Sequence, residues 1–411
     1  MSGAYLGHLI CSRCGAHIDE TTAFSPCRAC LEDGVLANPL PAYDPDGVSS
    51  GKVRDEEPGI FRFRHWLPLD DELAVVSKGE GDTPLLLCDR LGSMLGIDNL
   101  YIKNESVNPT WSYKDRLAAV ALSKARELEA AAVVVSSTGN HGAAASAYAA
   151  AAQIPCVALT IESVPQTMKV LMQAYGALVV AYETGPQRWE VMTAAVAQRG
   201  WMPLSGFNDP PFGSNPFGVD GYKTIAFEIL EDLGRAPDFV VVPTAYGDGI
   251  IGILRGFEDL VVMGRISQLP RMIAAEVSGT YEAAIRDNLE TPPRVNVAPS
   301  VAFSIATPIG TFQALHAIRS SNGHAVAVAD NSEIMETQAL VARNEGLYLE
   351  ASSALGVAAA SELRKRGIAQ NEDTIVVIGT STGLKDVDAT ARTLPPVPVL
   401  KPDLASLEAI L

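Results

Sequence analysis

The sequence has no excess of basic residues and few charged residues of either sign. Its 411 residues carry a formal charge of −17, and Asp, Glu, Lys and Arg together make up 19% of the chain. A nucleic-acid partner requires a basic footprint for the phosphate backbone, so we expect none. Low charge combined with 47% hydrophobic residues is typical of a globular protein and excludes a disordered one.

A targeting or membrane segment is also missing. The first residues lack a basic stretch followed by an apolar core, so we expect no secretory signal and a cytoplasmic protein. One apolar run, residues 143–161, is long enough to span a bilayer. It is mostly alanine and is broken by Gln153 and Pro155, which favours a buried helix leading into a strand. The sequence therefore predicts no membrane partner.

Cysteine is scarce, but four of the six cysteines form two Cys-x-x-Cys pairs, Cys11 with Cys14 and Cys27 with Cys30. In a cytoplasmic protein this pairing favours a structural zinc site over disulfides. Four thiolate ligands leave no open position for a substrate, so such a metal would be structural. The alternative is a degenerate knuckle that holds no metal.

Strands and helices alternate along most of the chain. Apolar runs at 131–135, 156–159, 177–180, 238–243 and 374–378 are typical of buried parallel strands, and alanine-rich or amphipathic stretches separate them. This alternation predicts an α/β protein with doubly wound sheets, and 411 residues predict more than one domain. Residues 36–60, rich in Pro, Gly and Asp, are predicted to be a linker.

Two loops between a strand and a helix are candidate anion sites. The loop from Ser136 to Gly142 combines hydroxyl groups with unpaired N–H groups at a helix start, which suits a substrate carboxylate. Residues 244–249 contain two glycines in the same setting, which suits a phosphate monoester. An ordinary capped loop is the plain alternative for each.

Residues 108–116 place Lys114 where a turn enters a helix. A lysine held there loses solvent, which favours the neutral amine that attacks a carbonyl to form a Schiff base. A solvated surface lysine is the alternative. The segment Asn-Pro-Thr-Trp-Ser-Tyr-Lys-Asp-Arg resembles Asn-Pro-Thr-Gly-Ser-Phe-Lys-Asp-Arg of threonine synthases, a family of pyridoxal-phosphate enzymes with the tryptophan-synthase-like fold.

Further landmarks of that family occur in the same order along nearly the whole chain. They are Gly-Glu-Gly-Asp-Thr-Pro-Leu (79–85), Ser-Thr-Gly-Asn (137–140), the return segment 215–224, Glu345–Ala354 and Gly379–Asp386. The resemblance implies two open-sheet domains of the pyridoxal-phosphate fold type II behind a small cysteine knuckle. We expect the knuckle at 1–35, the large domain at 36–100 and 215–411, and the small domain at 101–214.

The resemblance also implies roles for individual residues. Lys114 would carry pyridoxal 5'-phosphate as a Schiff base and remove the α-proton of an amino-acid substrate. Asn140 would lie beside the 3-oxygen of the cofactor, and Thr380 would bind the pyridine nitrogen. The cofactor phosphate would be held by Thr244, Ala245, Tyr246, Gly247, Asp248 and Gly249. The substrate would be bound by Trp111, Ser112, Ser137, Thr138, Gly139 and His141. A homodimer is usual for this fold.

Three departures from the family concern the substrate. Gly218 and Ala306 stand where arginine is common, and Trp111 stands where glycine is usual. Two enzymatic functions stay open: threonine synthase itself, which converts O-phosphohomoserine and water to threonine and phosphate, or a paralogue that eliminates or replaces a β- or γ-substituent of another amino acid. Lys114, Asn140 and Thr380 argue against a non-catalytic ligand-binding protein. A nicotinamide site is excluded because no Gly-x-Gly-x-x-Gly follows a strand with the required acidic residue.

Overall fold

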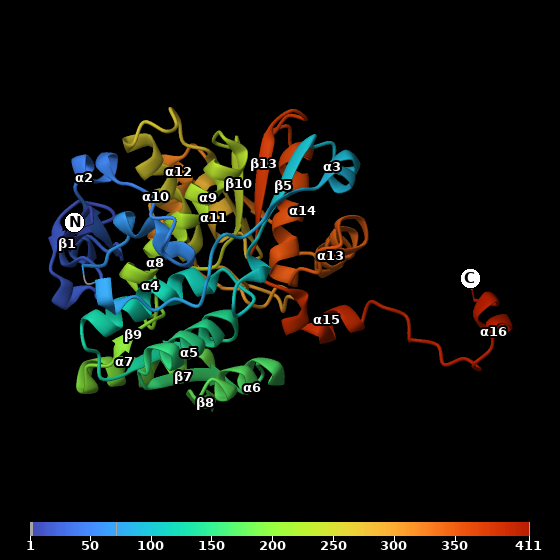
Figure 1. Ribbon diagram of the computed structural model, residues 1–411, viewed down its shortest axis with the longest axis horizontal. Helices are drawn as coiled ribbons and strands as arrows, with labels where there is room; N and C mark the ends of the chain where they lie inside the picture. The colour runs from blue at the N-terminus through green and yellow to red at the C-terminus, as the bar shows by residue number, and fades with distance from the viewer. Residues whose placement is uncertain (1–2, 71, 411) are drawn as a thin grey trace.

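The computed structural model describes residues 3–70 and 72–410, whose strands form three separate sheets (Figure 1). The smallest sheet is antiparallel, in the order β2-β1-β3, and contains β1 (Tyr5–Cys11), β2 (His17–Ile18) and β3 (Pro39–Tyr43). Helices α1 (Arg28–Glu32) and α2 (Pro45–Ser50) accompany it. The predicted linker at 36–60 is therefore wrong for β3 and α2. Proline is tolerated in β3 because this strand pairs only with β1, at the edge of the sheet.

The second sheet is parallel and has the order β8-β7-β6-β9. It contains β6 (Val133–Ser136), β7 (Cys156–Ile161), β8 (Leu178–Tyr182) and β9 (Met202–Pro203). Its crossover helices are α5 (Asn140–Ala152), α6 (Gln166–Ala174) and α7 (Gly185–Arg199). The apolar run at 143–161 is thus a buried alanine-rich helix followed by a strand, as predicted. Within the described residues, the structure has no helix long and apolar enough to cross a membrane.

The third and largest sheet has the order β12-β11-β10-β13-β5-β4, with only β4 antiparallel to its neighbour. It contains β4 (Leu85–Leu87), β5 (Asn99–Asn104), β10 (Phe239–Pro243), β11 (Arg271–Glu276), β12 (His324–Ala327) and β13 (Thr374–Gly379). Its helices are α3 (Asp89–Leu95), α9 (Lys223–Leu233), α10 (Asp248–Val262), α11 (Thr280–Arg286), α12 (Phe312–Ser320), α13 (Asn331–Glu345) and α14 (Ala351–Lys365).

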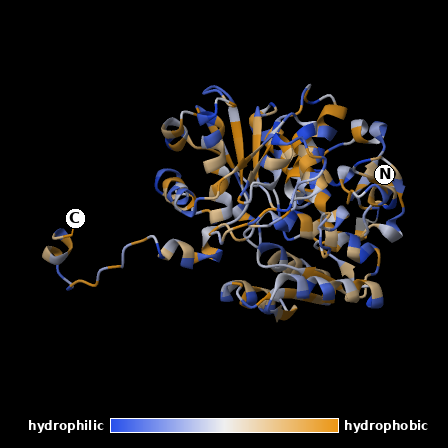
Figure 2. Ribbon diagram, turned by 180° about the vertical axis from the view of Figure 1, so that it is seen from behind, coloured by the Kyte–Doolittle hydropathy of each residue, from blue (hydrophilic) through white to orange (hydrophobic). Residues whose placement is uncertain are grey.

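Apolar strands account for the position of the core. Every residue of β10 and β13 is buried, and Figure 2 shows the strands of the largest sheet as hydrophobic ribbons between more polar helices. Strands covered on both faces require continuous apolar sequence, which is the pattern seen in these segments. The α/β fold with parallel sheets is confirmed.

Helix α4 (Lys114–Glu127) lies between the two large sheets (Figure 1). It packs against α5 on one side and against the short helix α8 (Pro216–Val219) on another. Strand β5, which precedes α4, pairs with β13 and β4 in the six-stranded sheet. Residues 101–104 thus lie with the larger sheet, although the sequence assigned them to the small domain.

The C-terminal segment leaves the body of the molecule after α15 (Val387–Ala391) (Figure 1). It ends in the short helix α16 (Leu404–Glu408), and the segment is exposed almost throughout. The site described next lies between the two large sheets.

Candidate active site

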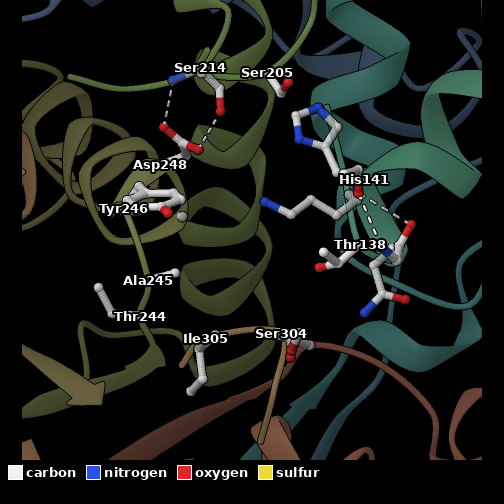
Figure 3. Close-up of a pocket in the computed structure, with 18 of the residues that line it drawn as sticks. Thr138, His141, Ser205, Ser214, Thr244, Ala245, Tyr246, Asp248, Ser304 and Ile305 are labelled. Atoms are coloured by element: carbon white, nitrogen blue, oxygen red, sulfur yellow. Dashed lines mark hydrogen bonds between the residues drawn. The ribbon is translucent and has the colours of Figure 1, made fainter. Parts of the chain in front are cut away.

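One cavity is lined by loops that follow the carboxyl ends of parallel strands in both large sheets (Figure 3). The loop after β6 supplies Thr138 and His141, the loop after β10 supplies residues 244–249, and Thr380 follows β13. Lys114 lines the same cavity from the start of α4. In open α/β sheets, ligands bind at this end of the strands. The sequence-predicted lysine, carboxylate loop, phosphate loop and ring partner therefore meet in one place.

The loop before Lys114 is fixed by buried hydrogen bonds. The carboxylate of Asp115 accepts bonds from the backbone N–H (2.9 Å) and hydroxyl (2.7 Å) of Thr110. Burial raises the pKa of Asp115 to about 6. Lys114 Nζ lies 4.9 Å from the centre of the Tyr113 ring and 5.7 Å from that of Tyr222, and these two rings stack at 4.8 Å. The lysine is thus presented by a rigid turn against an aromatic wall.

A buried ion cluster anchors the first turn of α4 behind Lys114. The guanidinium of Arg116 bonds Glu105 at 2.8 Å through Nε and Glu228 at 2.6 Å through Nη1, and all three side chains are buried. Thr83 donates its hydroxyl hydrogen to Glu105 at 2.6 Å. The Gly-Glu-Gly-Asp-Thr-Pro-Leu motif therefore supports the lysine loop from behind and does not line the cavity.

The carboxylate loop has free donors that face the cavity. Ser137 Oγ accepts bonds from the N–H groups of Gly139 (3.1 Å) and Gly142 (2.9 Å), which closes the turn into α5. Within the described chain, the N–H groups of Thr138, Asn140 and His141 donate to no protein acceptor. Orphan N–H groups at a helix start bind anions, so these three suit a carboxylate.

His141 adds no positive charge to this loop. Burial, and after it the positive charge of Lys114, hold the pKa of His141 well below its ordinary value. The ring is therefore neutral at pH 7, and its Nε2 is buried without a hydrogen-bond partner among the described residues.

The loop after β10 fits a phosphate monoester. Gly247 has a left-handed φ of 83°, and a Cβ there would lie 2.3 Å from the Cβ of Ala314. The next three N–H groups, at Asp248, Gly249 and Ile250, form no hydrogen bond with the part of the chain that the structure describes. Backbone donors at the N-terminus of a 15-residue helix offer a phosphate both hydrogen bonds and the positive end of the helix dipole.

The carboxylate oxygens of Asp248 are both hydrogen-bonded to other residues (Figure 3). The carboxylate accepts from the N–H (3.0 Å) and hydroxyl (2.6 Å) of Ser214, and from the side-chain amide of Gln313 at 2.8 Å. Both oxygens are thus engaged away from the three orphan N–H groups. The acidic residue in the loop is compatible with a bound phosphate, and its role is to tie the loop to Ser214.

Thr380 is positioned for a single hydrogen bond into the cavity. Its hydroxyl lies 2.7 Å from that of Ser353, and its backbone carbonyl accepts from the N–H of Tyr113 at 3.0 Å. A hydroxyl can pair with a pyridine nitrogen but, unlike a carboxylate, does not keep it protonated. The donor set therefore fits a pyridine ring with a phosphate, and we identify these residues as able to hold pyridoxal phosphate.

A polar network around Asn140 was not predicted from the sequence. Its side-chain oxygen accepts from Lys385 Nζ at 2.7 Å, and its amide donates to Glu350 at 2.7 Å. Glu350 also accepts from the hydroxyl of Ser304 at 2.9 Å. Lys385 and Glu350 lie within the quoted motifs, but these motifs do not reveal that both residues converge on Asn140.

Trp111 and Ser112, which the sequence assigned to the substrate, do not line the cavity. The Trp111 side chain is 45% exposed, and its φ is 61°, in the left-handed region. Glycine suits this backbone, so the family's usual glycine has a conformational reason. A substrate contact by Trp111 or Ser112 stays a prediction.

The two positions where arginine is absent differ in their surroundings. A Cβ on Gly218 would already lie 2.9 Å from the carbonyl oxygen of Leu117, so this position packs α8 against α4. Ala306 lines a second, outer cleft.

Arg188 on α7, which sequence analysis did not single out, lines both the cavity and the outer cleft. Nothing in its local sequence distinguishes it from a solvated helix arginine.

The four cysteines of the N-terminal unit come together as predicted. Their sulfur atoms all lie within 4.8 Å of one another, with 3.6 Å between Cys11 and Cys30 and 3.8 Å between Cys14 and Cys27. Ligands of tetrahedral zinc at about 2.3 Å would be about 3.8 Å apart. The cluster could therefore hold a metal ion of that size.

Comparisons with known proteins agree with this geometry. Residues 76–381 match a family of pyridoxal-phosphate-dependent enzymes. The chain is 37% identical to threonine synthase of Methanocaldococcus jannaschii, covering 93% of this chain and 94% of the relative, and 33% identical to that of Methanosarcina acetivorans, covering 92% of each. The structure of maize serine racemase superposes with a TM-score of 0.64 at 21% identity, over 76% of this chain and 91% of that one. The last likeness concerns the fold alone.

Proposed function

We propose the reaction of this chain from its family. The chain belongs to the threonine synthase family of pyridoxal-phosphate-dependent enzymes. It would convert O-phospho-L-homoserine and water to L-threonine and phosphate. The observation that carries this proposal is the convergence of Lys114, the carboxylate loop, the phosphate loop and Thr380 on one cavity. The relatives named threonine synthase support the choice of substrate, because the chain matches them over nearly their full length.

Each group would have a distinct task. Pyridoxal phosphate, when bound, supplies a carbonyl for amines and an electron sink for the carbanion that deprotonation creates. The N–H groups of Asp248, Gly249 and Ile250 would hold its phosphate, with residues 244–247 shaping the loop. Asn140 would lie beside its 3-oxygen, and Thr380 would pair with its ring nitrogen without keeping that nitrogen charged.

Lys114 would act on the substrate in two ways. Its Nζ would hold the cofactor until an amino acid displaces it, and the freed amine would then remove the proton from the substrate's α-carbon. The N–H groups of Thr138, Asn140 and His141 would bind the α-carboxylate and fix that carbon near Lys114. The depressed pKa of His141 makes its ring a weak base, which favours Lys114 as the group that accepts the proton.

A paralogous activity on another amino acid is the second candidate. It is favoured by Gly218, whose packing against α4 leaves no room for the arginine that is common there in the family. Elimination or replacement of a β- or γ-substituent would use the same lysine and the same carboxylate loop. Products formed from a panel of amino acids and their phosphorylated or acylated derivatives distinguish the two candidates.

The central test uses purified protein supplied with pyridoxal phosphate. The wild type should acquire a visible absorbance band, and reduction with borohydride should fix the cofactor on the peptide that contains Lys114. Lys114→Ala should lose this attachment, whereas Lys365→Ala, on the exposed end of α14, should keep it. Release of phosphate and threonine from O-phospho-L-homoserine would support the first candidate. Absorbance changes without turnover of any amino acid would support a ligand-binding protein instead.

Four further assignments belong to this proposal. The cysteine cluster would hold zinc, since four thiolates at these separations suit that ion. The protein would work in the cytoplasm, where free thiols persist. The active unit would be a homodimer, which light scattering of the purified protein tests. The two large sheets would be the centres of two domains, with residues 99–104 in the domain of the six-stranded sheet.

A further inference from the structure

Arg188 occupies the boundary between two spaces. It lies in the first turns of α7 and lines the cavity that contains Lys114 and the carboxylate loop. It also lines the outer cleft, as do Thr138 and Tyr246. A group attached to the substrate beyond its α-carbon would therefore meet this side chain between the site of chemistry and the outer cleft.

The guanidinium of Arg188 lacks a counter-charge. Its Nε and Nη1 are shielded from solvent and have no hydrogen-bond partner, and no carboxylate of the described residues forms a salt bridge with it. Burial accordingly lowers the pKa of Arg188 from its ordinary value. Arg188 is partly exposed, but donors shielded from water cost free energy when they have no partner. An anion from outside the chain would supply the missing hydrogen bonds.

The cofactor phosphate already has its own cradle. Three orphan N–H groups at the start of α10 serve it, and they belong to the domain of the six-stranded sheet. Arg188 instead follows β8 in the four-stranded sheet, whose β6 also carries the carboxylate loop. Its position therefore groups it with the residues that face the substrate.

Few other cations are available for this task. Of the described residues that line the cavity, Lys114 and Arg188 are the two with strongly basic side chains, and Lys114 is committed to the cofactor and the α-proton. Gly218 is a packing position and Ala306 is apolar. A phosphate monoester calls for a guanidinium, which matches it with two parallel N–H···O bonds.

We propose that Arg188 binds the phosphate group at the end of the substrate's side chain and so selects phosphorylated amino acids. This inference rests on the proposed function, because it takes the cavity to be the substrate site. Arg188 would also keep the departing phosphate bound through N–H donors while the bond to carbon breaks. The residue is one that determines specificity, with no part in moving the α-proton.

The test compares two ligands that differ by the phosphate alone. Titration of O-phospho-L-homoserine and of L-homoserine into the holoenzyme, followed by cofactor absorbance, gives a dissociation constant for each. Arg188→Gln should weaken binding of the phosphorylated ligand at least about tenfold, the scale of a lost charged hydrogen bond, and leave homoserine binding within about twofold. Arg188→Lys should recover part of the loss. In calorimetry, inorganic phosphate should bind most tightly to wild type, less tightly to Arg188→Lys and least tightly to Arg188→Gln.

Arg294→Gln is the matched control. Arg294 lines the outer cleft, does not line the cavity, and is paired with Asp209 at 2.6 Å, so its loss should leave both constants unchanged. The affinity for pyridoxal phosphate is measured in every variant. A defect of Arg188→Gln confined to pyridoxal phosphate would assign the arginine to the cofactor and overturn the proposal.

Other outcomes are equally decisive. Equal weakening of both amino acids, or unchanged binding of the phosphorylated one, would overturn the proposal. Far-ultraviolet circular dichroism shows whether Arg188→Gln is folded. If it is not, the ratio of the dissociation constants for homoserine and O-phospho-L-homoserine is compared between Arg188→Lys and wild type. If the wild type produces threonine and Arg188→Gln binds O-phospho-L-homoserine unchanged, the proposed function stands and this inference is wrong. If Arg188 is needed to bind a different phosphorylated amino acid, this inference stands and the proposed function is wrong.

Discussion

Lys385 donates a hydrogen bond of 2.7 Å from Nζ to the side-chain oxygen of Asn140, and this pair joins the chain's last core strand to its carboxylate loop. Lys385 is buried, and burial lowers its pKa to about 8, although the carboxylates of Glu350 and Asp115 oppose that shift. Lys385, with a pKa of about 8, thus contacts the residue that we place beside the cofactor.

The cofactor should report this titration. As pH rises through about 8, Lys385 loses its proton and its bond to Asn140 loses charge assistance, so the absorbance of the bound cofactor should change with a midpoint near pH 8. Lys385→Met should lack this step. Lys365→Met, an exposed lysine far from the cavity, should retain it. A step that persists in Lys385→Met would assign the titration to another group.

Stability should depend on pH through the same residue. The pKa of Lys385 is lower in the folded protein, about 8, than the ordinary value of about 10.4 expected after unfolding, so burying the charged amine destabilises the protein below pH 8. That penalty disappears as pH rises from about 8 to about 10.4. The free energy of unfolding in urea should therefore rise by more in wild type than in Lys385→Met across this window. If the free energy of unfolding changes with pH to the same extent in both proteins, the expectation is wrong.

The buried cluster behind Lys114 should dominate local stability. Glu228→Gln removes the charge that pairs with Arg116 at 2.6 Å and with Lys103 at 3.0 Å. The two buried cations then share one carboxylate fewer, with Glu105 and Asp232 as their remaining partners. We expect a loss of about 3–5 kcal/mol in the free energy of unfolding, measured by urea titration. Asp287→Asn, which breaks an exposed pair with Arg286, should leave the free energy of unfolding nearly unchanged, because water screens that pair.

Trp111 gives a test of backbone strain. Its left-handed φ of 61° costs an L-residue about 1–2 kcal/mol, which glycine avoids. Both Trp111→Gly and Trp111→Ala remove the half-exposed indole, so packing losses are matched, and only glycine relieves the strain. The glycine variant should be more stable than the alanine variant by about 1 kcal/mol in thermal or urea unfolding. Equal stabilities would show that this turn is unstrained.

Metal content can be tested on single cysteine variants. Purified wild type should contain about one zinc per chain by elemental analysis. Cys30→Ser should lose the metal and lower the melting temperature, because the cluster connects β1 with α1. Cys88→Ser, a buried cysteine outside the cluster, should keep the metal. Full zinc occupancy in Cys30→Ser would show that this thiolate is not a ligand.

Local sequence patterns predicted the residues whose roles depend on their own segment. The apolar strands, the loop after β6 and the lysine turn each carry the necessary signal within about ten residues, and the structure brings them to one cavity. Local sequence patterns do not predict a residue's role when that role depends on a partner far away in the sequence. Arg188 has the sequence context of a solvated residue, and only the packed structure shows its buried nitrogens. The sequence shows that glycine replaces an arginine at 218, but only the structure shows the close contact with Leu117 that leaves no room for a larger side chain.

The order of strands in the largest sheet has a consequence for biosynthesis. Strand β13, residues 374–379, lies between β10 and β5, although it is the last of the six strands to be translated. A growing chain on the ribosome therefore lacks this interior strand until the other five strands of the sheet have been made. The same strand delivers Thr380 next to the turn that presents Lys114. The two sides of the cavity can therefore be joined only after this last strand has been made.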